Sequence, residues 1–239
     1  MVLEVKNLCN NYLHDVSFEL KKGEILGFTG LVGAGRSELA RAVYGADPID
    51  SGKVFLHGEE MHFKIPADAV DCDICYLSED RRRDGLLIGH NIVDNTTLSS
   101  LNKFISHHFI SNAKSEESSA KVNEIVSTKC SSGLQNVETL SGGNQQKVII
   151  ARWLLADSEI FILDEPTRGI DIGAKDEIYS IIEKLSEEGK SIILISSDNA
   201  ELKRMCNRVL VMCEGRITAE LLPSQLDKQL VLHYATLRE

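Results

Sequence analysis

The segment EILGFTGLVGAGRSELARAVYG, residues 24–45, restricts the fold of this chain more than any other part of the sequence. Its apolar first part predicts a buried strand, and Gly30 opens a loop rich in glycine. Helical spacing follows over residues 37–44, and Gly45 is a typical end of a helix. A strand, a glycine loop and a helix in this order predict an α/β fold.

The loop matches the phosphate-binding pattern G-x-x-x-x-G-K-[ST], except that arginine stands in the lysine position. Glycines let backbone N–H groups turn toward phosphate oxygens, and the start of the following helix adds unpaired donors. Arginine keeps the positive charge but is longer and bulkier than lysine. An ordinary glycine-rich turn is the alternative for the loop taken alone. The residues predicted to bind the phosphates are Gly30, Gly33, Ala34, Gly35, Arg36, Ser37 and Glu38.

A second apolar run, IFILDE, predicts a buried strand that ends in two carboxylates, Asp164 and Glu165. Ligands bind at the carboxyl ends of the strands in open α/β sheets. We expect Asp164 and the hydroxyl of Ser37 to hold Mg²⁺, and Glu165 to orient or deprotonate an attacking water. The alternative is a strand that simply leaves into a charged turn, stopped by Pro166.

The third motif is TLSGGNQQKV, residues 139–148, in which Ser141, Gly142 and Gly143 precede a helix. Backbone donors at such a helix start can bind an anion, although the same pattern also serves as a plain N-cap. Apolar strands then alternate with amphipathic helices, which predicts a mostly parallel sheet covered on both faces. The polar segment NAKSEESSA stays open between a helix and a mobile loop.

Charge and composition exclude several classes of protein. The formal charge of −10 argues against a non-specific nucleic-acid binder, which would carry a basic surface. No apolar run reaches the roughly 18–20 residues that cross a bilayer, and the N-terminus lacks a signal-peptide pattern, so we expect a cytosolic chain. The pair Cys72 and Cys75 has no second pair, which favours structural thiols over a zinc or redox site. His107 and His108 show no ligand spacing and are expected at the surface.

Together the three motifs resemble those of the ATP-binding cassette (ABC) ATPases, in the right order and over nearly the whole chain. GLVGAGRSEL, YLSEDRRRDGL, LSGGNQQKV, LDEPTRGIDIGAK and LISSD are similar to the second nucleotide-binding half of monosaccharide importer ATPases of the ribose/galactose/xylose type. In that group two cassettes are fused in one polypeptide. The resemblance therefore implies that this chain is an excised half or a truncated product.

The resemblance implies an α/β fold of the P-loop NTPase class with an ABC-type core. That core would have a mostly parallel sheet, an N-terminal antiparallel β part and an inserted helical subdomain. Residues 1–85 and 145–222 would form the RecA-like nucleotide-binding core with its antiparallel part. Residues 86–144 would form the helical signature subdomain, and residues 223–239 a C-terminal tail.

Three departures from a fully active cassette fall at positions where the family does its chemistry. By the resemblance, arginine at the lysine position is characteristic of the second half of these importer ATPases. Glu79 stands where a glutamine contacts Mg²⁺ and the attacking water, and Ser197 stands where a histidine contacts the γ-phosphate. The resemblance thus implies a site that binds ATP and Mg²⁺ but hydrolyses slowly or not at all. Tyr12 lies where a family aromatic residue stacks on adenine.

The resemblance also implies partners. A second cassette, as the other half of a fused protein or as a homodimer, would place its nucleotide against Ser141 and Gly143, with Asp171 in the loop along the seam. Alone, the chain is expected to form a weak or nucleotide-dependent dimer. Membrane permease subunits would dock near residues 81–83, for which a solvated basic surface is the alternative. A periplasmic sugar-binding protein would act indirectly, with no nucleic acid, and the chain would sit peripherally at the cytoplasmic face of the inner membrane.

The leading functional hypothesis is an ATPase half that powers simple-sugar uptake. One alternative is a regulatory half that binds nucleotide without hydrolysing it, and another is a cassette of a nucleoside or autoinducer importer. A cassette of DNA repair or translation is disfavoured, because the sequence shows neither a long coiled-coil insertion nor a basic linker. The identity of the sugar is not encoded in a cassette.

Overall fold

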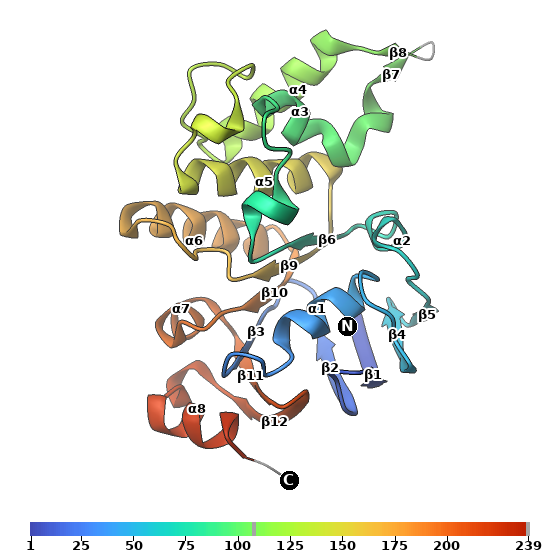
Figure 1. Ribbon diagram of the computed structural model, residues 1–239, viewed down its shortest axis with the longest axis vertical. Helices are drawn as coiled ribbons and strands as arrows, with labels where there is room; N and C mark the ends of the chain where they lie inside the picture. The colour runs from blue at the N-terminus through green and yellow to red at the C-terminus, as the bar shows by residue number, and fades with distance from the viewer. Residues whose placement is uncertain (107–108, 238–239) are drawn as a thin grey trace. The chain divides into compact units, whose positions relative to one another are not determined.

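The computed structural model describes residues 1–106 and 109–237 of the chain (Figure 1). These residues form two compact units. The first unit comprises Met1–Tyr76, Glu159–Glu165 and Ile182–Glu239, and the second comprises Leu77–Ser158 and Pro166–Ile181. The helix α6 (Ile172–Glu187) begins in the second unit and ends in the first. The division into a nucleotide-binding core, a helical subdomain and a tail, which the family resemblance implied, remains a prediction.

An antiparallel sheet forms the N-terminal part of the first unit, as the family resemblance implied. Its strands follow the order β2-β1-β4-β5. In β2 every second residue is buried, because one face of the strand meets the core and the other meets solvent. The four strands are β1 (Leu3–Cys9), β2 (Val16–Leu20), β4 (Ser51–Leu56) and β5 (Glu59–Met61).

A six-stranded sheet, in the order β12-β11-β3-β10-β9-β6, is the centre of the first unit. The strands β11, β3, β10 and β9 pair in parallel, and a hairpin at Glu214–Gly215 adds β12 antiparallel at the edge. The sheet is therefore mostly parallel but mixed. Its strands are β3 (Ile25–Gly30), β6 (Ile74–Leu77), β9 (Ile160–Asp164), β10 (Ser191–Ile195), β11 (Arg208–Cys213) and β12 (Arg216–Leu221).

The central strands β9 and β10 are buried at every position and mostly apolar, because both of their faces are covered. One face packs with the antiparallel sheet and with α1 (Arg36–Val43), whose Leu39 and Val43 belong to the core. The other face approaches α7 (Asn199–Met205) closely at Gly27, where a Cβ atom would lie 2.8 Å from Cys206 Sγ. The remaining helices of this unit are α2 (Pro66–Val70), η4 (Pro223–Gln225) and α8 (Lys228–Ala235).

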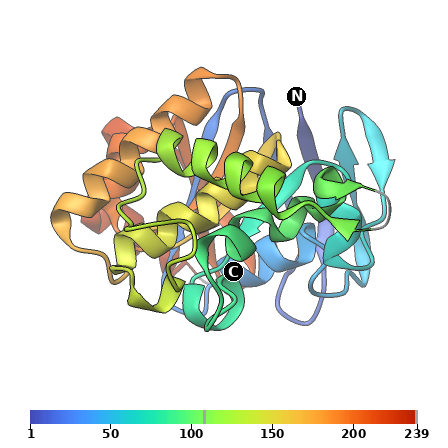
Figure 2. The same ribbon diagram turned by 90° about the horizontal axis from the view of Figure 1, so that it is seen from above.

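The second unit is mainly helical. Its α-helices include α3 (Ile92–Thr97), α4 (Asn112–Ile125) and α5 (Gly142–Ala156), and seen from above α4 crosses over α5 (Figure 2). The buried Arg152 of α5 holds this unit together, because its guanidinium donates to the carbonyls of Gly85 and Asn95, both at 2.7 Å. Its other elements include η1 (Arg81–Gly85), η2 (Leu98–Phe104), η3 (Val137–Thr139), β7 (Ile105–Ser106) and β8 (Phe109–Ile110).

Several local expectations have a clear outcome. The segment NAKSEESSA, which the sequence left open, is helical within α4, and the expected C-terminal tail contains α8. All six cysteines are free thiols. Within residues 1–106 and 109–237, no helix is long and apolar enough to span a membrane. His107 and His108 lie outside the described residues.

Candidate functional site

The glycine loop lies in the first unit between β3 and α1, where its backbone is held by the β11–β12 turn. The amide of Gly215 donates to the carbonyl of Ala34 at 2.9 Å. Gly35 has a φ of 97°, and a Cβ atom there would lie 3.1 Å from the Cα of Gly215. A side chain at this position would therefore be strained and would displace the turn. Gly30 and Gly33 also have positive φ, and Glu38 lies in the first turn of α1.

Arg36, the residue in the lysine position, points its guanidinium toward the end of β9. Its Nη1 lies 3.7 Å from Oε1 of Glu165, and both side chains are nearly buried, with 11% and 13% exposed. The same Nη1 atom has no hydrogen-bond partner. A buried N–H donor without a partner is costly, so this atom is available to an incoming acceptor.

Asp164 is the second unsatisfied group of the site. Its residue is 1% exposed, and its Oδ2 accepts a hydrogen bond from the hydroxyl of Tyr76 at 3.1 Å. Its side chain is also hydrogen-bonded to Ser37, whereas Oδ1 has no partner. Burial raises the pKa of Asp164 above its ordinary value, and the hydrogen bonds with Ser37 and Tyr76 oppose this shift. A buried carboxylate oxygen beside a hydroxyl is a suitable pair of ligands for a hard cation.

Glu165 is held in an unusual conformation. Its φ of 49° is left-handed, which is uncommon for a residue other than glycine and occurs frequently at functional positions. Its Oε1 accepts a hydrogen bond from the backbone amide of Ser197 at 2.8 Å. The structure thus brings Arg36, Ser37, Asp164, Glu165 and Ser197 together at the carboxyl edge of the six-stranded sheet.

Tyr12 belongs to the same unit and is 62% exposed. The carbonyl of Tyr12 packs against Gly215, the residue that also supports the glycine loop. The ring is therefore presented on the surface near the loop, a placement compatible with stacking on a base.

In the second unit, the LSGG segment forms the start of α5, with Ser141 as the N-cap residue. The two glycines that follow have no space for side chains. A Cβ atom on Gly142 would lie 2.6 Å from Nη2 of Arg81, and one on Gly143 would lie 2.6 Å from the Cβ of Ala174. The helix start is therefore tightly packed on α6 while Ser141 stays exposed.

Arg81 holds this helix start from the side of η1. Its Nε donates to Oε1 of Gln145 at 3.3 Å, and its Nη1 donates to the carbonyl of Arg168 at 3.0 Å. Of the three consecutive arginines, Arg82 and Arg83 are exposed, as expected for a solvated basic surface, but Arg81 is not. Glu79, just before them, forms an ion pair with Arg168.

An ion pair between a buried lysine and a partly exposed glutamate connects α5 to α6 within the second unit. Lys147 is 1% exposed, and its Nζ lies 2.6 Å from Oε2 of Glu177 and 2.9 Å from the carbonyl of Ser127. Asp171, which the resemblance assigned to a dimer seam, accepts a hydrogen bond from the amide of Ala174 and so caps α6. The sequence did not predict the roles of Tyr76, Arg81, Lys147 and Arg168, since each depends on a contact between distant segments. Tyr76 and Lys147 were signalled in the sequence only as polar residues within or beside apolar runs, and Arg81 and Arg168 were not signalled at all.

Comparison with known proteins identifies relatives of the chain. A family model described as ABC transporter matches residues 13–168. The whole chain aligns with a putative ribose/galactose/methyl galactoside import ATP-binding protein of Burkholderia cenocepacia at 47% identity. The alignment covers 47% of that relative's length. The ribose import ATP-binding protein RbsA of Bacillus cereus aligns at 42% identity. This alignment covers 93% of the chain and 45% of the relative. The chain thus spans about half the length of the curated relatives it matches.

Solved structures show the same fold. A nucleotide-free ATP-binding cassette from an ABC transporter superposes with a TM-score of 0.83, covering 100% of this chain and 99% of the other at 20% identity. A dimeric cassette in a post-hydrolysis state, bound to ADP and phosphate, superposes with a TM-score of 0.79 over 92% of this chain and 98% of the other.

Proposed function

We propose that this chain, which belongs to the ABC transporter family, binds Mg-ATP as one half of a simple-sugar importer and couples that binding to uptake. The observation that carries the nucleotide site is the buried, unpartnered Oδ1 of Asp164 beside Ser37, at the start of the helix that follows the glycine loop. Helix starts and glycine loops bind phosphate, and a cation is needed to offset its charge.

Asp164 and Ser37 fit Mg²⁺, because a hard cation takes oxygen ligands and Asp164 has a buried carboxylate oxygen with no other partner. When bound, the ion would neutralise negative charge on the phosphates. The backbone of residues 30–37 would surround the phosphates, and Arg36 Nη1 would donate to one of their oxygens. Tyr12 would stack on the base.

The contacts of the same residues are reasons to expect slow hydrolysis. Glu165 would orient or deprotonate the attacking water, but its Oε1 is already engaged by the Ser197 amide and by the charge of Arg36. Ser197 cannot supply the positive charge that a histidine would, and Glu79 carries a negative charge paired with Arg168. A regulatory half that binds nucleotide with little turnover is therefore the second candidate.

The partners of this half follow from the family and from the length of the relatives. A second cassette, within a fused protein or as a second copy, would bind its nucleotide against Ser141, Gly142 and Gly143. Permease subunits would contact the second unit near η1, which would hold the protein peripherally at the cytoplasmic face of the inner membrane. A periplasmic binding protein would deliver a sugar of the ribose or galactose type, while nucleoside or autoinducer import is the competing specificity.

Calorimetric titration with Mg-ATP tests the nucleotide site. We expect saturable binding by the wild-type chain and no binding by Gly35→Val, because a side chain there would displace the turn at Gly215. Gly58→Val is the matched control, since Gly58 also has a positive φ of 87° but lies in the β4–β5 turn with nothing within 4 Å. Absence of heat with the wild-type chain at millimolar Mg-ATP would contradict the proposal.

Turnover measurements separate the two candidates. The chain is expected to hydrolyse Mg-ATP very slowly alone, and Arg36→Lys, Glu79→Gln, Ser197→His in one protein is expected to be faster. Recovery of turnover in that variant supports the regulatory role. The catalytic role is supported if a two-cassette protein still hydrolyses ATP rapidly when its first half is inactivated and its second half is this wild-type chain.

A further inference from the structure

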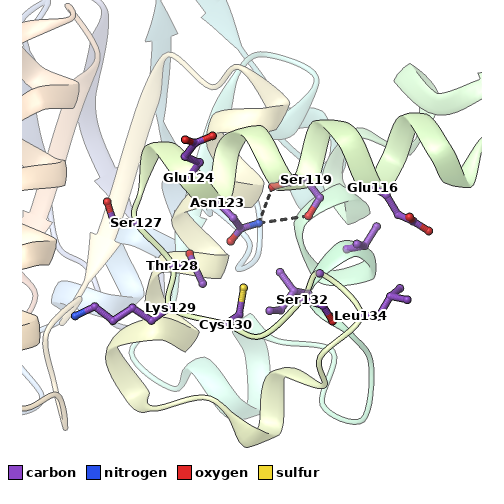
Figure 3. A pocket seen from close by; sticks show the side chains of 14 residues that line it. Glu116, Ser119, Asn123, Glu124, Ser127, Thr128, Lys129, Cys130, Ser132 and Leu134 are labelled. Carbon is purple, nitrogen blue, oxygen red and sulfur yellow. Dashed lines mark hydrogen bonds between the residues drawn. The ribbon is translucent and has the colours of Figure 1, made fainter.

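A pocket of about 760 Å³ lies in the second unit, between α4 and the loop of residues 127–134 (Figure 3). We call it the α4 pocket. It contains none of the residues assigned to nucleotide binding. Its apolar wall comes from α3, α4 and the loop, and polar side chains of α4 and the loop, such as Ser119, Asn123 and Thr128, line the rest. Six of the residues that line it are Ile92, Val93, Ala120, Asn123, Thr128 and Leu134.

Asn123 presents an unsatisfied acceptor to this pocket. The residue is 6% exposed, and its Oδ1 has no hydrogen-bond partner. Its Nδ2 donates to the Ser119 carbonyl at 2.9 Å and to the Thr96 hydroxyl at 3.0 Å. A carbonyl can only accept, so the amide cannot be reversed without placing two acceptors against each other. In Figure 3 the Asn123 side chain points from α4 toward the loop that carries Thr128, whose buried Oγ1 also lacks a partner.

Two unpaired groups among apolar walls are typical of a ligand site rather than of a closed core. Buried polar atoms in folded proteins are nearly always hydrogen-bonded, because an unpaired buried group loses its bonds to water without replacement. Small-molecule sites combine apolar walls with a few placed polar groups. A ligand with a hydrogen-bond donor would satisfy Asn123 Oδ1 while its apolar part covers Ile92, Val93 and Leu134, the last of which is 65% exposed.

The charge around the α4 pocket selects a cation. Glu116, Ala120 and Glu124 lie at a spacing of four residues and so share one face of α4. Both glutamates line the pocket, and neither side chain has an ion-pair partner among the described residues. Lys129 also lines the pocket, but its ammonium pairs with Glu177 at 3.1 Å, and Figure 3 shows it pointing away from the opening. The two glutamates therefore give the rim of the pocket a negative charge, and Figure 3 shows the Glu124 carboxylate on the side of α4 away from Asn123, so its attraction for a cation acts over a distance.

The loop side of the pocket is preformed. The Ser127 carbonyl accepts from Lys147 at 2.9 Å, and the Lys129 amide donates to Oδ1 of Asn144 at 2.8 Å. Both contacts fix the loop to α5, so ligand binding would require little ordering of the wall. Binding is favoured when the site does not have to be ordered first.

We propose that the α4 pocket is a binding site for a small amphipathic amine. The protonated amino group donates to Asn123 Oδ1 in the field of Glu116 and Glu124, and the apolar body lies on Ile92, Val93 and Leu134. The site goes beyond the proposed nucleotide function and stands without it. No bond is made or broken, and the ligand binds reversibly.

Three compounds that share a phenylethyl group but differ in their polar end test the class of ligand. They are phenethylamine, 2-phenylethanol and 3-phenylpropionate. Binding to the intact chain is followed by calorimetry and by amide chemical shifts. We expect the amine to bind at least about tenfold more tightly than the carboxylate, a difference of about 1.4 kcal/mol, with the alcohol between them. Shifts are expected at residues 119–134. Equal affinity of the carboxylate, or no amine binding up to about 10 mM, would overturn the proposal.

Variants locate the site. Ala120 is exposed, so Ala120→Trp fills the pocket without entering the core, and it should abolish amine binding. Glu116→Gln with Glu124→Gln should weaken the amine about tenfold and leave the alcohol unchanged. The matched control is Glu59→Gln with Glu187→Gln, which makes the same change in net charge at exposed positions outside the pocket. Binding that persists in Ala120→Trp, or that falls equally in the control, would refute the assignment.

Discussion

Nη1 of Arg36 and Oε1 of Glu165 lie 3.7 Å apart, and both side chains are almost completely buried. The residue that should meet the phosphate thus lies within ion-pair distance of the residue that should meet the attacking water, without a hydrogen bond from Nη1. A charged pair of this kind competes with an incoming phosphate for the same guanidinium. The contact explains how arginine is accommodated in the lysine position.

Removing the charge of Glu165 should therefore strengthen nucleotide binding. We expect Glu165→Gln to raise the affinity for Mg-ATP about five- to tenfold, because Arg36 is released and a negative charge near the phosphate is lost. Calorimetry measures the change, and Glu159→Gln, whose side chain pairs with His57, is the control. A double-mutant cycle with Arg36→Lys should show coupling between the two sites. An unchanged or lower affinity of Glu165→Gln would contradict this competition.

Asp164 should make the stability of the nucleotide-free protein depend on pH. Its pKa in the folded protein is raised, mainly by burial, above the ordinary value of 3.8. The folded state therefore binds the proton more strongly, so this group favours folding below pH 3.8 and loses that contribution as pH rises through its raised pKa. At neutral pH the buried carboxylate is a net cost.

Asp164→Asn is accordingly expected to stabilise the nucleotide-free chain at pH 7.5. A gain of about 1 kcal/mol would raise Tm by about 2–4 °C, and the gain should shrink as the pH is lowered toward 4. The same variant should lose the extra stabilisation that Mg-ATP gives the wild-type chain. Thermal unfolding at several pH values measures both effects, with Asp50→Asn as an exposed control. A constant difference between pH 4 and pH 7.5 would argue against the burial effect.

Breaking the Lys147–Glu177 pair should cost more from one side than from the other. Glu177→Leu leaves a buried ammonium without its carboxylate, and we expect a loss of about 3 kcal/mol. Lys147→Met leaves a carboxylate that water can reach, so we expect about 1–2 kcal/mol. Lysine contacts also lower the pKa of Glu177, so its contribution is present above pH 4.5 and is lost as pH falls through the lowered pKa.

Urea unfolding at pH 7.5 and at acid pH measures this asymmetry. Glu183→Leu is the control on the same helix, since Glu183 makes only an exposed ion pair with Arg204, and its effect should stay within about 0.5 kcal/mol. Equal losses for Glu177→Leu and Lys147→Met would show that burial of Lys147 does not set the energy of the pair.

The two signature glycines should differ in their tolerance of a methyl group. Gly142→Ala would meet the guanidinium of Arg81, which can shift only by straining its hydrogen bonds to Gln145 and Arg168, and we expect a loss of about 0.5–1 kcal/mol. Gly143→Ala would meet the Cβ of Ala174 at 2.6 Å, so α5 and α6 must separate, and we expect a loss of about 1–3 kcal/mol. Ala174→Gly should rescue Gly143→Ala when urea unfolding is measured. Failure of the rescue would mean that the loss has another origin.

The order of motifs was sufficient to predict the glycine loop, the strand ending in Asp164 and Glu165, and the helix after Ser141. These features are local, because glycine patterns, apolar runs and helix caps act over a few neighbouring residues. The antiparallel N-terminal sheet and the mostly parallel central sheet followed from the alternation of strands with helices and from the family resemblance.

The environment of each charged group was decided by the tertiary structure. Nothing near Arg36 in the sequence indicates that it meets Glu165, nor does the run of arginines indicate that Arg81 alone supports the start of α5. The helical state of α4 also depended on packing, because its own sequence is polar and only weakly periodic. Burial, unpaired atoms such as Asn123 Oδ1, and ion pairs such as Lys147–Glu177 arise when segments far apart in the chain meet. Local patterns carry no information about those distances, so they determined which elements form, and the packing of the elements determined what their side chains contact.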